Sequence, residues 1–267
     1  MNNRPVLFMD SGIGGLPYCR HFLNRNPDES VVYLADRFNF PYGGREKEEL
    51  VRIITNLTKQ AVKIFNPKII ALVCNTASLT ALSHLREYFP ELSFVGTVPA
   101  VKPAVLASKT GKIGVLGTEL TVREAYIEQL AAENGGGEII GIAAPELVRF
   151  VEHRFASASA EEKAEVVQSY VDRFRSAGVD VLVLGCTHFL FLLDEFKQKA
   201  APSITVFDSV KGVTRRVESL LAEKFDSVCE SNTAGNRFVL TGNTAPEPSW
   251  EYWAGRLGFT VSLLENV

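Results

Sequence analysis

Short runs of apolar residues alternate along the chain with longer segments in which apolar residues recur every three or four positions. The short runs predict buried strands, and the longer periodicity predicts helices with one covered face. Strands that are apolar at nearly every position are typical of parallel sheets covered by helices on both faces, so we predict an α/β fold. The predicted strands are 4–10, 30–36, 67–73, 112–118, 138–143, 180–185 and 204–210, and the predicted helices are 48–65, 79–89, 121–134, 144–155, 160–178, 189–198 and 212–225.

One local pattern occurs twice. In IIALVCNTASLTAL and again in VLVLGCTHFLFLL, an apolar strand is followed by a cysteine, a short polar turn and an apolar helix. Two similar halves that face a shared cleft would bring the turns at Cys74 and Cys186 to one place. The same spacing can also arise by chance in an α/β protein, so the repeat alone leaves both interpretations open.

Length and composition limit the classes of protein to consider. A chain of 267 residues can form one large domain or two smaller ones. The net charge of −3 does not predict a nucleic-acid partner. The sequence holds no apolar run of the length that crosses a membrane, and its first residues do not resemble a secretory signal. We therefore expect a cytoplasmic protein with no membrane or nucleic-acid partner.

Polar residues gather where predicted strands end, which is where open α/β sheets bind ligands. The glycine-rich loop DSGIGGL follows one such end and is either an anion site made of backbone N–H groups or a plain tight turn. Asp10 before the loop argues against a phosphate, because like charges repel. The residues at these ends are Asp10, Ser11, Cys74, Asn75, Thr76, Cys186, Thr187 and His188.

The four cysteines have no CxxC pair, so we expect free thiols. A thiolate at a helix N-terminus is stabilised by the helix dipole and by free N–H groups, although most buried cysteines are small core residues. Cys74 and Cys186 occupy matching contexts before predicted helices, so we predict that they form a catalytic pair. Cys19, on a predicted helix after the glycine-rich loop, and Cys229, in a polar tract, lack that context and are expected to be inert.

His188 follows Cys186 by two residues and could hydrogen-bond to its thiol. A zinc site would need two ligands beyond these, and although Cys74 could supply one, no clear fourth exists, so we predict no metal. On a turn, two residues this close in sequence are awkwardly placed to face each other as a nucleophile and its base.

These residues suit one kind of reaction, the transfer of a proton at a substrate carbon that carries a carboxylate and an ammonium group. The protein would supply two thiols, a carboxylate and hydroxyl groups around an anion site. One thiolate removes the α-proton and the opposite thiol returns a proton to the other face. Asp10 and His188 could tune the two thiols separately. Such a two-base reaction needs no cofactor, and no pyridoxal phosphate site is evident in the sequence, so we expect none.

Several stretches together resemble the glutamate racemases of the aspartate/glutamate racemase family. They lie in that family's order between residue 6 and about residue 217, and the combination of CNTAS and GCTH with DSGIGG and PYG is specific. The stretches are FMDSGIGGL, YLAD with FPYGGR, LVCNTAS, IGVLGTELT, PELVRFVE, LGCTHF and FDS.

The resemblance implies two pseudo-symmetric parallel-sheet α/β domains, 1–97 plus 208–267 and 98–207, with the active site in the cleft between them. It implies a bacterial cytoplasmic enzyme, usually a homodimer, that supplies D-glutamate for peptidoglycan and so for cell shape. By residue matching, Asp10 assists Cys74, whereas His188 and Glu152 assist Cys186. The residues expected to hold the small-molecule substrate, glutamate, are Asp10, Ser11, Tyr42, Gly43, Asn75, Thr76, Thr121, Thr187 and His188.

Three alternatives stay open. The first is a racemase for aspartate, a hydantoin or another amino-acid-like substrate, because the sequence does not measure the pocket. The second is a hydrolase that uses Cys186, His188 and Asp10, for which Cys74 would be dispensable. The third is a catalytically idle anion-binding protein, against which the intact cysteine pair argues.

Overall fold

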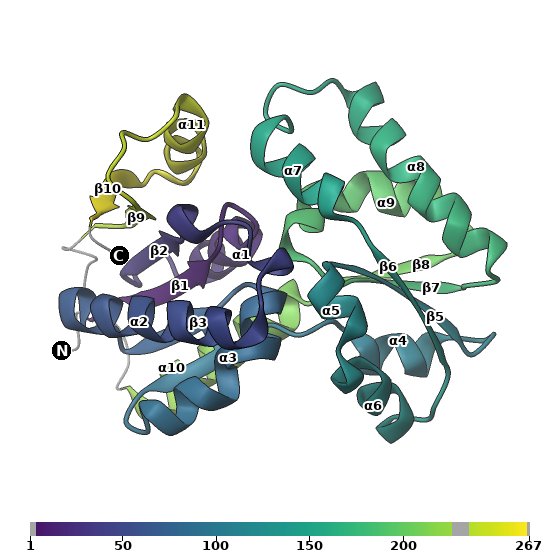
Figure 1. Ribbon diagram of the computed structural model, residues 1–267, viewed down its shortest axis with the longest axis horizontal. Coiled ribbons are helices and arrows are strands. Elements are labelled where there is room, and N and C mark those ends of the chain that lie inside the picture. Colours follow the sequence, from purple (N-terminus) through teal and green to yellow (C-terminus); the bar gives the residue numbers. More distant parts are fainter. Residues whose placement is uncertain (1–3, 226–234, 266–267) are drawn as a thin grey trace. The chain divides into compact units, whose positions relative to one another are not determined.

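The computed structural model describes residues 4–225 and 235–265. The chain divides into two compact units, Met1–Thr97 with Val210–Val267 and Val98–Ser209. Each unit contains one sheet whose strands are all parallel, with helices between successive strands (Figure 1). The predicted α/β class with two parallel sheets is confirmed.

The first unit contains a six-stranded sheet in the order β10-β9-β2-β1-β3-β4. Its central strands β1, β2 and β3 are buried at every position, which explains their uninterrupted apolar sequences. The strands are β1 Val6–Asp10, β2 Val31–Ala35, β3 Ile69–Leu72, β4 Ser93–Gly96, β9 Arg237–Thr241 and β10 Thr260–Leu264; the helices are α1 Leu16–Arg25, α2 Lys47–Phe65, α3 Asn75–Tyr88, α10 Val210–Lys224 and α11 Pro248–Leu257.

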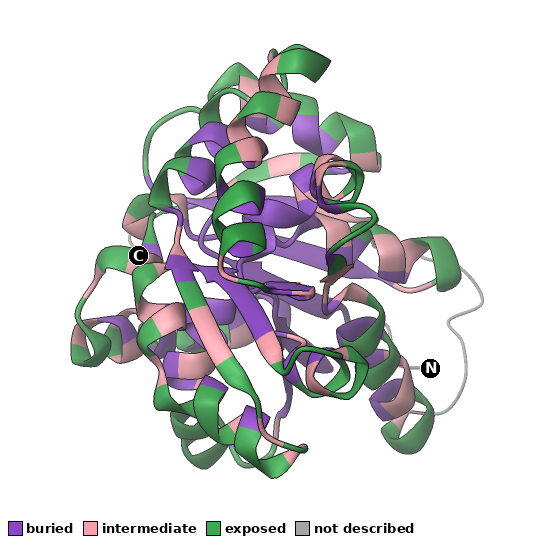
Figure 2. Cartoon of the chain, turned by 90° about the vertical axis from the view of Figure 1, so that its right-hand side faces the viewer, coloured by how far each residue is buried: buried purple, intermediate pink, exposed green. Residues whose placement is uncertain are grey.

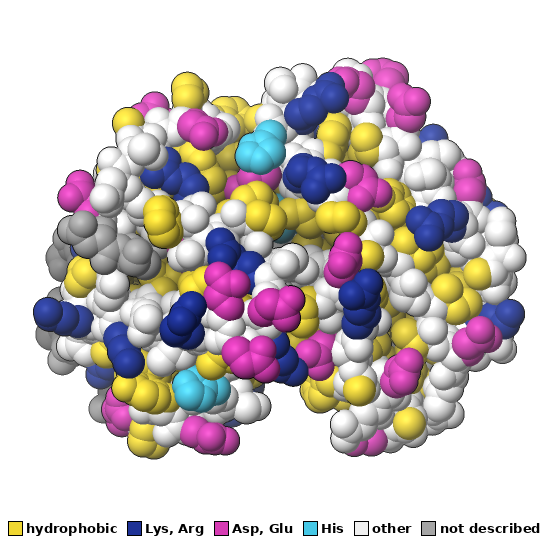
Figure 3. Space-filling model, in the orientation of Figure 1, with side chains coloured by type: hydrophobic (Ala, Val, Ile, Leu, Met, Phe, Trp, Pro, Cys, Tyr) yellow, Lys and Arg dark blue, Asp and Glu magenta, His cyan; other side chains and the backbone are white. Residues whose placement is uncertain are grey.

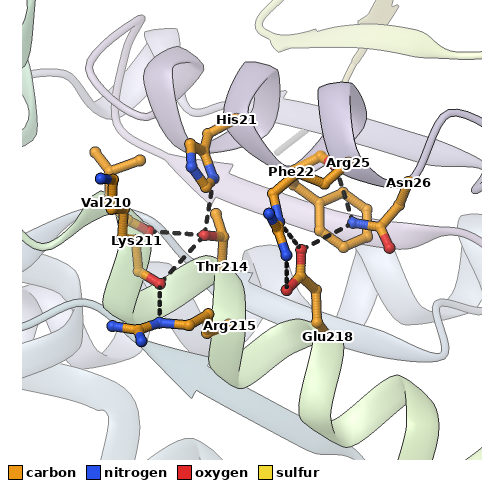
Figure 4. A network of polar contacts seen from close by, with 9 residues as sticks. All are labelled: His21, Phe22, Arg25, Asn26, Val210, Lys211, Thr214, Arg215 and Glu218. Atoms are coloured by element: carbon orange, nitrogen blue, oxygen red, sulfur yellow. Dashed lines mark hydrogen bonds and ion pairs between the residues drawn. The ribbon is translucent and has the colours of Figure 1, made fainter.

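The C-terminal part of the chain returns to this first sheet, where α10 packs against α1 (Figure 4). Arg25 Nε donates to Glu218 Oε1 at 2.7 Å, and Thr214 Oγ1 lies 2.9 Å from His21 Nδ1. Asn26 Nδ2 also donates to the Glu218 carboxylate, at 3.2 Å. These polar contacts fix the position of α10 along α1, which apolar packing alone does not do.

The second unit contains a four-stranded sheet in the order β6-β5-β7-β8. Helix α8 starts at a capping box, in which Glu162 N donates to Ser159 Oγ and Ser159 N donates to the Glu162 carboxylate. The strands are β5 Lys112–Gly117, β6 Glu138–Ala143, β7 Val181–Leu184 and β8 Thr205–Phe207; the helices are α4 Val101–Ala107, α5 Glu119–Arg123, α6 Ala125–Glu133, α7 Pro145–His153, α8 Ala160–Ser176 and α9 Leu193–Ala200.

The two sheets share one topology. Numbered within its own unit, each sheet places its first four strands in the order second, first, third, fourth, and β9 and β10 extend the first sheet beyond its second strand. Cys74 follows the third strand of one unit, and Cys186 follows the third strand of the other. The repeat in the sequence therefore reflects a repeat of the fold.

Burial follows the layers of each unit. The sheets are mainly buried, and the helices are buried along one face and exposed along the other (Figure 2). Acidic and basic side chains are interspersed on the face shown in Figure 3. Within residues 4–225 and 235–265, no helix is both long and apolar enough to cross a membrane.

The structure contains elements that the sequence pattern did not predict. They are the strands β4, β9 and β10 and the helices α4 and α11. The predicted helix 121–134 is in fact two helices, α5 and α6, because Glu124 between them has an extended backbone with ψ of 120°. Helix α3 starts at Asn75, directly after Cys74, rather than after the CNTAS turn.

Asp180, just before β7, holds the segment that leads into β5. Its carboxylate accepts hydrogen bonds from Ser108 Oγ at 2.6 Å, Lys109 N at 2.6 Å, Thr110 N at 3.1 Å and Thr110 Oγ1 at 2.9 Å. Burial raises the pKa of this carboxyl, but the hydrogen bonds outweigh burial and lower the pKa to about 2. The carboxylate thus stabilises the fold above its unfolded-state pKa, and that stability is lost as pH falls towards 2.

We predict that Asp180→Asn lowers the melting temperature at pH 7 by a few degrees, because an amide cannot accept all of these hydrogen bonds. The difference from the wild type should shrink between about pH 4 and pH 2, where the wild-type carboxylate is itself protonated. Thermal unfolding followed by circular dichroism measures both effects, with Asp28→Asn at an exposed position as the control. A difference that stays constant down to pH 2 would contradict this role.

Candidate functional site

In the first unit, the predicted polar residues lie at the carboxyl edge of the sheet. Asp10 ends β1, and Cys74 comes two residues after the end of β3. Because β1 and β3 are parallel neighbours, their ends meet at one edge, and Val73 N donates to Met9 O at 2.9 Å there. Asp10 and Cys74 are 3% and 6% exposed. The sheet thus places a buried carboxyl group and a buried thiol at the same edge.

The glycine-rich loop after Asp10 is held by its own contacts. Gly12 N donates to Asp10 Oδ1 at 2.7 Å, and the buried Tyr33 hydroxyl accepts from Gly15 N and donates to Gly12 O. A Cβ atom on Gly15 would lie 2.4 Å from Val73 Cγ2, so this close approach requires glycine. Two N–H groups of the loop therefore already donate to protein atoms and are not available to an anion. This favours the tight turn over an anion site that uses every N–H group of the loop.

Tyr42 reaches this edge from the short helical turn Tyr42–Gly44. Its hydroxyl donates to Asp36 Oδ2 at 2.6 Å. Burial, then the charge and hydrogen bond of Asp36, then the charges of Cys74 and Asp10 raise the pKa of Tyr42 well above its ordinary value. Tyr42 is therefore a neutral phenol close to both Asp10 and Cys74, with half-buried Gly43 beside it in the chain.

Sequence analysis missed Asp36, although it ends a predicted strand just as Asp10 does. Asp36 is fully buried and accepts from Tyr42, from Thr241 Oγ1 at 2.7 Å and from Asn39 Nδ2. Thr241 ends β9, a strand that the sequence pattern did not predict, so nothing in the sequence indicated this contact.

Helix α3 starts immediately after Cys74, which is its N-cap residue. Asn75, Thr76 and Ser11 are all buried here. Both polar atoms of the Asn75 side chain are buried without a hydrogen-bond partner among the described residues. Since buried amides almost always have partners, Asn75 is suited to bind a ligand or water at this edge.

In the second unit, Cys186 follows β7 and precedes the helical turn Thr187–Leu192. Its Sγ lies 3.8 Å from His188 Nδ1, and His188 Nε2 lies 2.8 Å from Glu152 Oε2 of α7. The expected hydrogen bond between His188 and the Cys186 thiol is present. The expectation that these two residues are awkwardly placed to face each other was wrong, because the turn after the strand folds the ring back onto the sulfur. All three side chains are buried.

The protonation of His188 follows from these contacts. Burial lowers the pKa of its imidazole, but the hydrogen bonds and charges of Cys186 and Glu152 outweigh burial and raise the pKa well above the ordinary value. A doubly protonated ring can donate to the sulfur through Nδ1 and to the carboxylate through Nε2. The arrangement is therefore a buried chain of the Cys186 sulfur, an imidazolium and a carboxylate.

The predicted threonines of this unit lie at neighbouring strand ends. Thr187 directly follows Cys186, and Thr121 lies in α5, which follows β5, the parallel neighbour of β7. Both are buried, and Thr121 Oγ1 lies 3.0 Å from Thr118 Oγ1.

The remaining cysteines differ in context. Cys19 is fully buried in α1, and burial raises the pKa of its thiol, which favours the uncharged form. Cys229 lies outside the described residues. No cluster of three or more His, Cys, Asp or Glu side chains suited to a metal ion occurs in the parts of the chain that the structure describes.

Comparison with known sequences gives a consistent result. The family model of Asp/Glu/Hydantoin racemases matches residues 25–217. A glutamate racemase from Sphingopyxis alaskensis is 38% identical over 219 residues, which cover 81% of each chain. One from Herpetosiphon aurantiacus is 37% identical over 223 residues, 83% of this chain and 86% of the relative.

Two solved structures agree over nearly the whole chain. The Escherichia coli glutamate racemase in complex with L-glutamate and the activator UDP-MurNAc-Ala matches with a TM-score of 0.83 and 27% identity, over 98% of each chain. A glutamate racemase isoform from Bacillus anthracis matches with a TM-score of 0.80 and 27% identity, over 100% of this chain and 98% of the other. The family model matches more than half of the chain, and together these matches show that the chain belongs to the Asp/Glu/Hydantoin racemase family and is an amino-acid racemase.

Proposed function

We propose that this racemase interconverts L- and D-glutamate, with Cys74 and Cys186 as the two bases and without a cofactor. The observation that carries the proposal is the matched placement of the two thiols. Each follows the third strand of a parallel sheet with the same strand order, and each stands directly before a helical turn. Glutamate as the substrate is supported by the relatives, which are glutamate racemases at 37–38% identity.

In the proposed reaction, one cysteine acts as a thiolate and the other as a thiol. The thiolate removes the Cα proton, so the C–H bond breaks and its electron pair delocalises into the adjacent carboxylate. The opposite thiol then donates its proton to the other face of Cα and becomes a thiolate. Protons and charge balance, and the two sulfur atoms exchange roles for the reverse direction.

On the side of Cys74, Asp10 is the proposed partner of the thiol. Its carboxylate is held by Gly12 N, and Ser11 Oγ lies 3.5 Å from the same oxygen. Tyr42, kept neutral by burial and by Asp36, already donates its hydroxyl proton to Asp36, so it can accept a further hydrogen bond but carries no charge. We assign Ser11, Tyr42, Gly43, Asn75 and Thr76 to substrate binding, and Asn75 has two buried polar atoms to offer.

On the side of Cys186, His188 is the proposed partner of the thiol, and it also contacts substrate. Glu152 touches His188 rather than the reacting atoms, so we treat it as a positioning residue that keeps the ring protonated and oriented. Thr187 and Thr121 are the proposed hydrogen-bonding groups for the substrate.

The proposed location, assembly and cellular role follow from the family resemblance. We propose a cytoplasmic homodimer that supplies D-glutamate for peptidoglycan, with 1–97 plus 208–267 and 98–207 as the two domains that bind one substrate. A racemase specific for aspartate or a hydantoin remains the competing proposal of the same class.

A hydrolase is the second candidate, because Cys186, His188 and Glu152 are arranged as a nucleophile, a base and an orienting carboxylate. Glu152, rather than the Asp10 expected for this alternative, contacts His188. The two proposals differ in the role of Cys74. A hydrolase would work without it, whereas a two-base racemase would not.

We predict that Cys74→Ser and Cys186→Ser each lower kcat for racemisation by about 10²- to 10⁴-fold or more, because a serine hydroxyl is a far weaker acid and base than a thiol. Cys19→Ser and Cys229→Ser should be nearly silent. The assay follows optical rotation from D-glutamate and from L-glutamate without added cofactor, and then from aspartate. Full activity of Cys74→Ser would refute the two-base mechanism, and decay of rotation with aspartate alone would reassign the substrate.

We predict that Glu152→Gln shifts the alkaline limb of the kcat–pH profile to lower pH. The carboxylate helps to raise the pKa of His188, so without it the ring loses its proton at lower pH, and activity that needs the imidazolium is lost earlier. Glu146→Gln on the same helix, whose carboxylate accepts from the Tyr170 hydroxyl instead, is the matched control. Equal profiles for Glu152→Gln and wild type would show that Glu152 does not act through His188.

A further inference from the structure

A groove of about 540 Å³ is lined by residues of α7 and α8 of the second unit. Its apolar walls come from Leu147 and Phe150 of α7 and from Val166 and the ring of Tyr170 on α8. This volume falls in the range of small-molecule sites in proteins. The apolar walls suit the body of an organic ligand rather than a bare inorganic ion.

The groove is separate from the proposed catalytic residues, although it shares a helix with one of them. Arg149, Phe150 and His153 of α7 line the groove, whereas Glu152 does not. Glu152 is buried, and its carboxylate faces His188. Helix α7 thus presents one set of side chains to the groove and another to the catalytic histidine.

The polar groups of the groove favour an anion. Two arginines, Arg149 and Arg154, line it, against one acidic group, Glu146. Arg149 is exposed and has no hydrogen-bond or ion-pair partner among the described residues, so its guanidinium is available to a ligand. Arg154 is already paired with Glu162 at 2.7 Å.

The single acid is itself engaged. Glu146 Oε1 accepts a hydrogen bond from the Tyr170 hydroxyl. Burial, together with the hydrogen bond and charge of Glu146, raises the pKa of Tyr170, so the hydroxyl remains a donor to this carboxylate. Glu146 therefore has a hydrogen-bond partner within the wall, whereas Arg149 has none among the described residues.

We propose that the α7–α8 groove binds a small amphipathic anion, with an aromatic or branched apolar body between Phe150 and Val166 and a phosphate or carboxylate bound by Arg149. An arginine fork matches the oxygens of either group with paired hydrogen bonds.

The test is isothermal titration calorimetry of the full chain with 1-naphthyl phosphate, compared with uncharged 1-naphthol. The phosphate should bind at least about tenfold more tightly than the naphthol, and Arg149→Ala should remove most of that difference. Ser169→Trp, an exposed groove position on α8, should block both ligands by filling the space. Arg52→Ala, an exposed arginine on α2, is the matched control and should bind as wild type does.

Two further measurements test whether the variants remain folded and whether the groove is distinct from the glutamate site. Circular dichroism melts of Arg149→Ala and Ser169→Trp should match wild type, because both positions are exposed. Saturating glutamate should leave the affinity for naphthyl phosphate unchanged, because the groove excludes the proposed catalytic residues. No binding, binding that both variants leave unchanged, or competition by glutamate would each overturn the proposed site, and none of them would bear on racemisation itself.

Discussion

The positions of the two candidate cysteines depend on one constraint, the parallel pairing of a first strand with a third strand, β1 with β3 and β5 with β7. Hydrogen bonds along these buried ladders fix where each strand ends, and the carboxyl ends of parallel neighbours meet at one edge. Asp10 and Cys74 share such an edge because of the first pairing. Thr121 and Cys186 follow neighbouring strand ends because of the second.

Burial at these edges makes each polar contact energetically significant. A buried carboxylate without donors would destabilise the fold by several kcal/mol, on the order expected for an uncompensated charge. Asp36 avoids this cost with donors from Tyr42, Asn39 and Thr241, and Glu152 is paired with His188. Neutral Asn75 retains two buried polar atoms with no partner among the described residues, which is the kind of exception expected where a ligand binds.

The sequence predicted the α/β class and the central strands because buried parallel strands are apolar throughout. The sequence pattern did not predict the two edge strands of the first sheet. Burial is incomplete in β4 and alternates in β10. The pattern also did not predict β9, which lies in the C-terminal part of the chain. The hydrogen bond between His188 and Cys186 was expected from their spacing. The way these two side chains face each other, and the role of Asp36, could not be predicted, since both depend on how short turns fold back. Glu152 entered only through the family resemblance, because nothing local links it to a residue 36 positions away.

The central claim, that two thiols act on opposite faces of one carbon, is tested most directly by racemising L-glutamate in D₂O to low conversion. Mass spectrometry then measures deuterium at Cα separately in the D-glutamate formed and in the L-glutamate that remains. Two bases predict that the product carries solvent deuterium while the remaining substrate still carries its original proton, because the proton returned comes from a different, solvent-exchanged sulfur. Product that keeps the original proton, or equal deuterium in both enantiomers from the start, would contradict the two-thiol account.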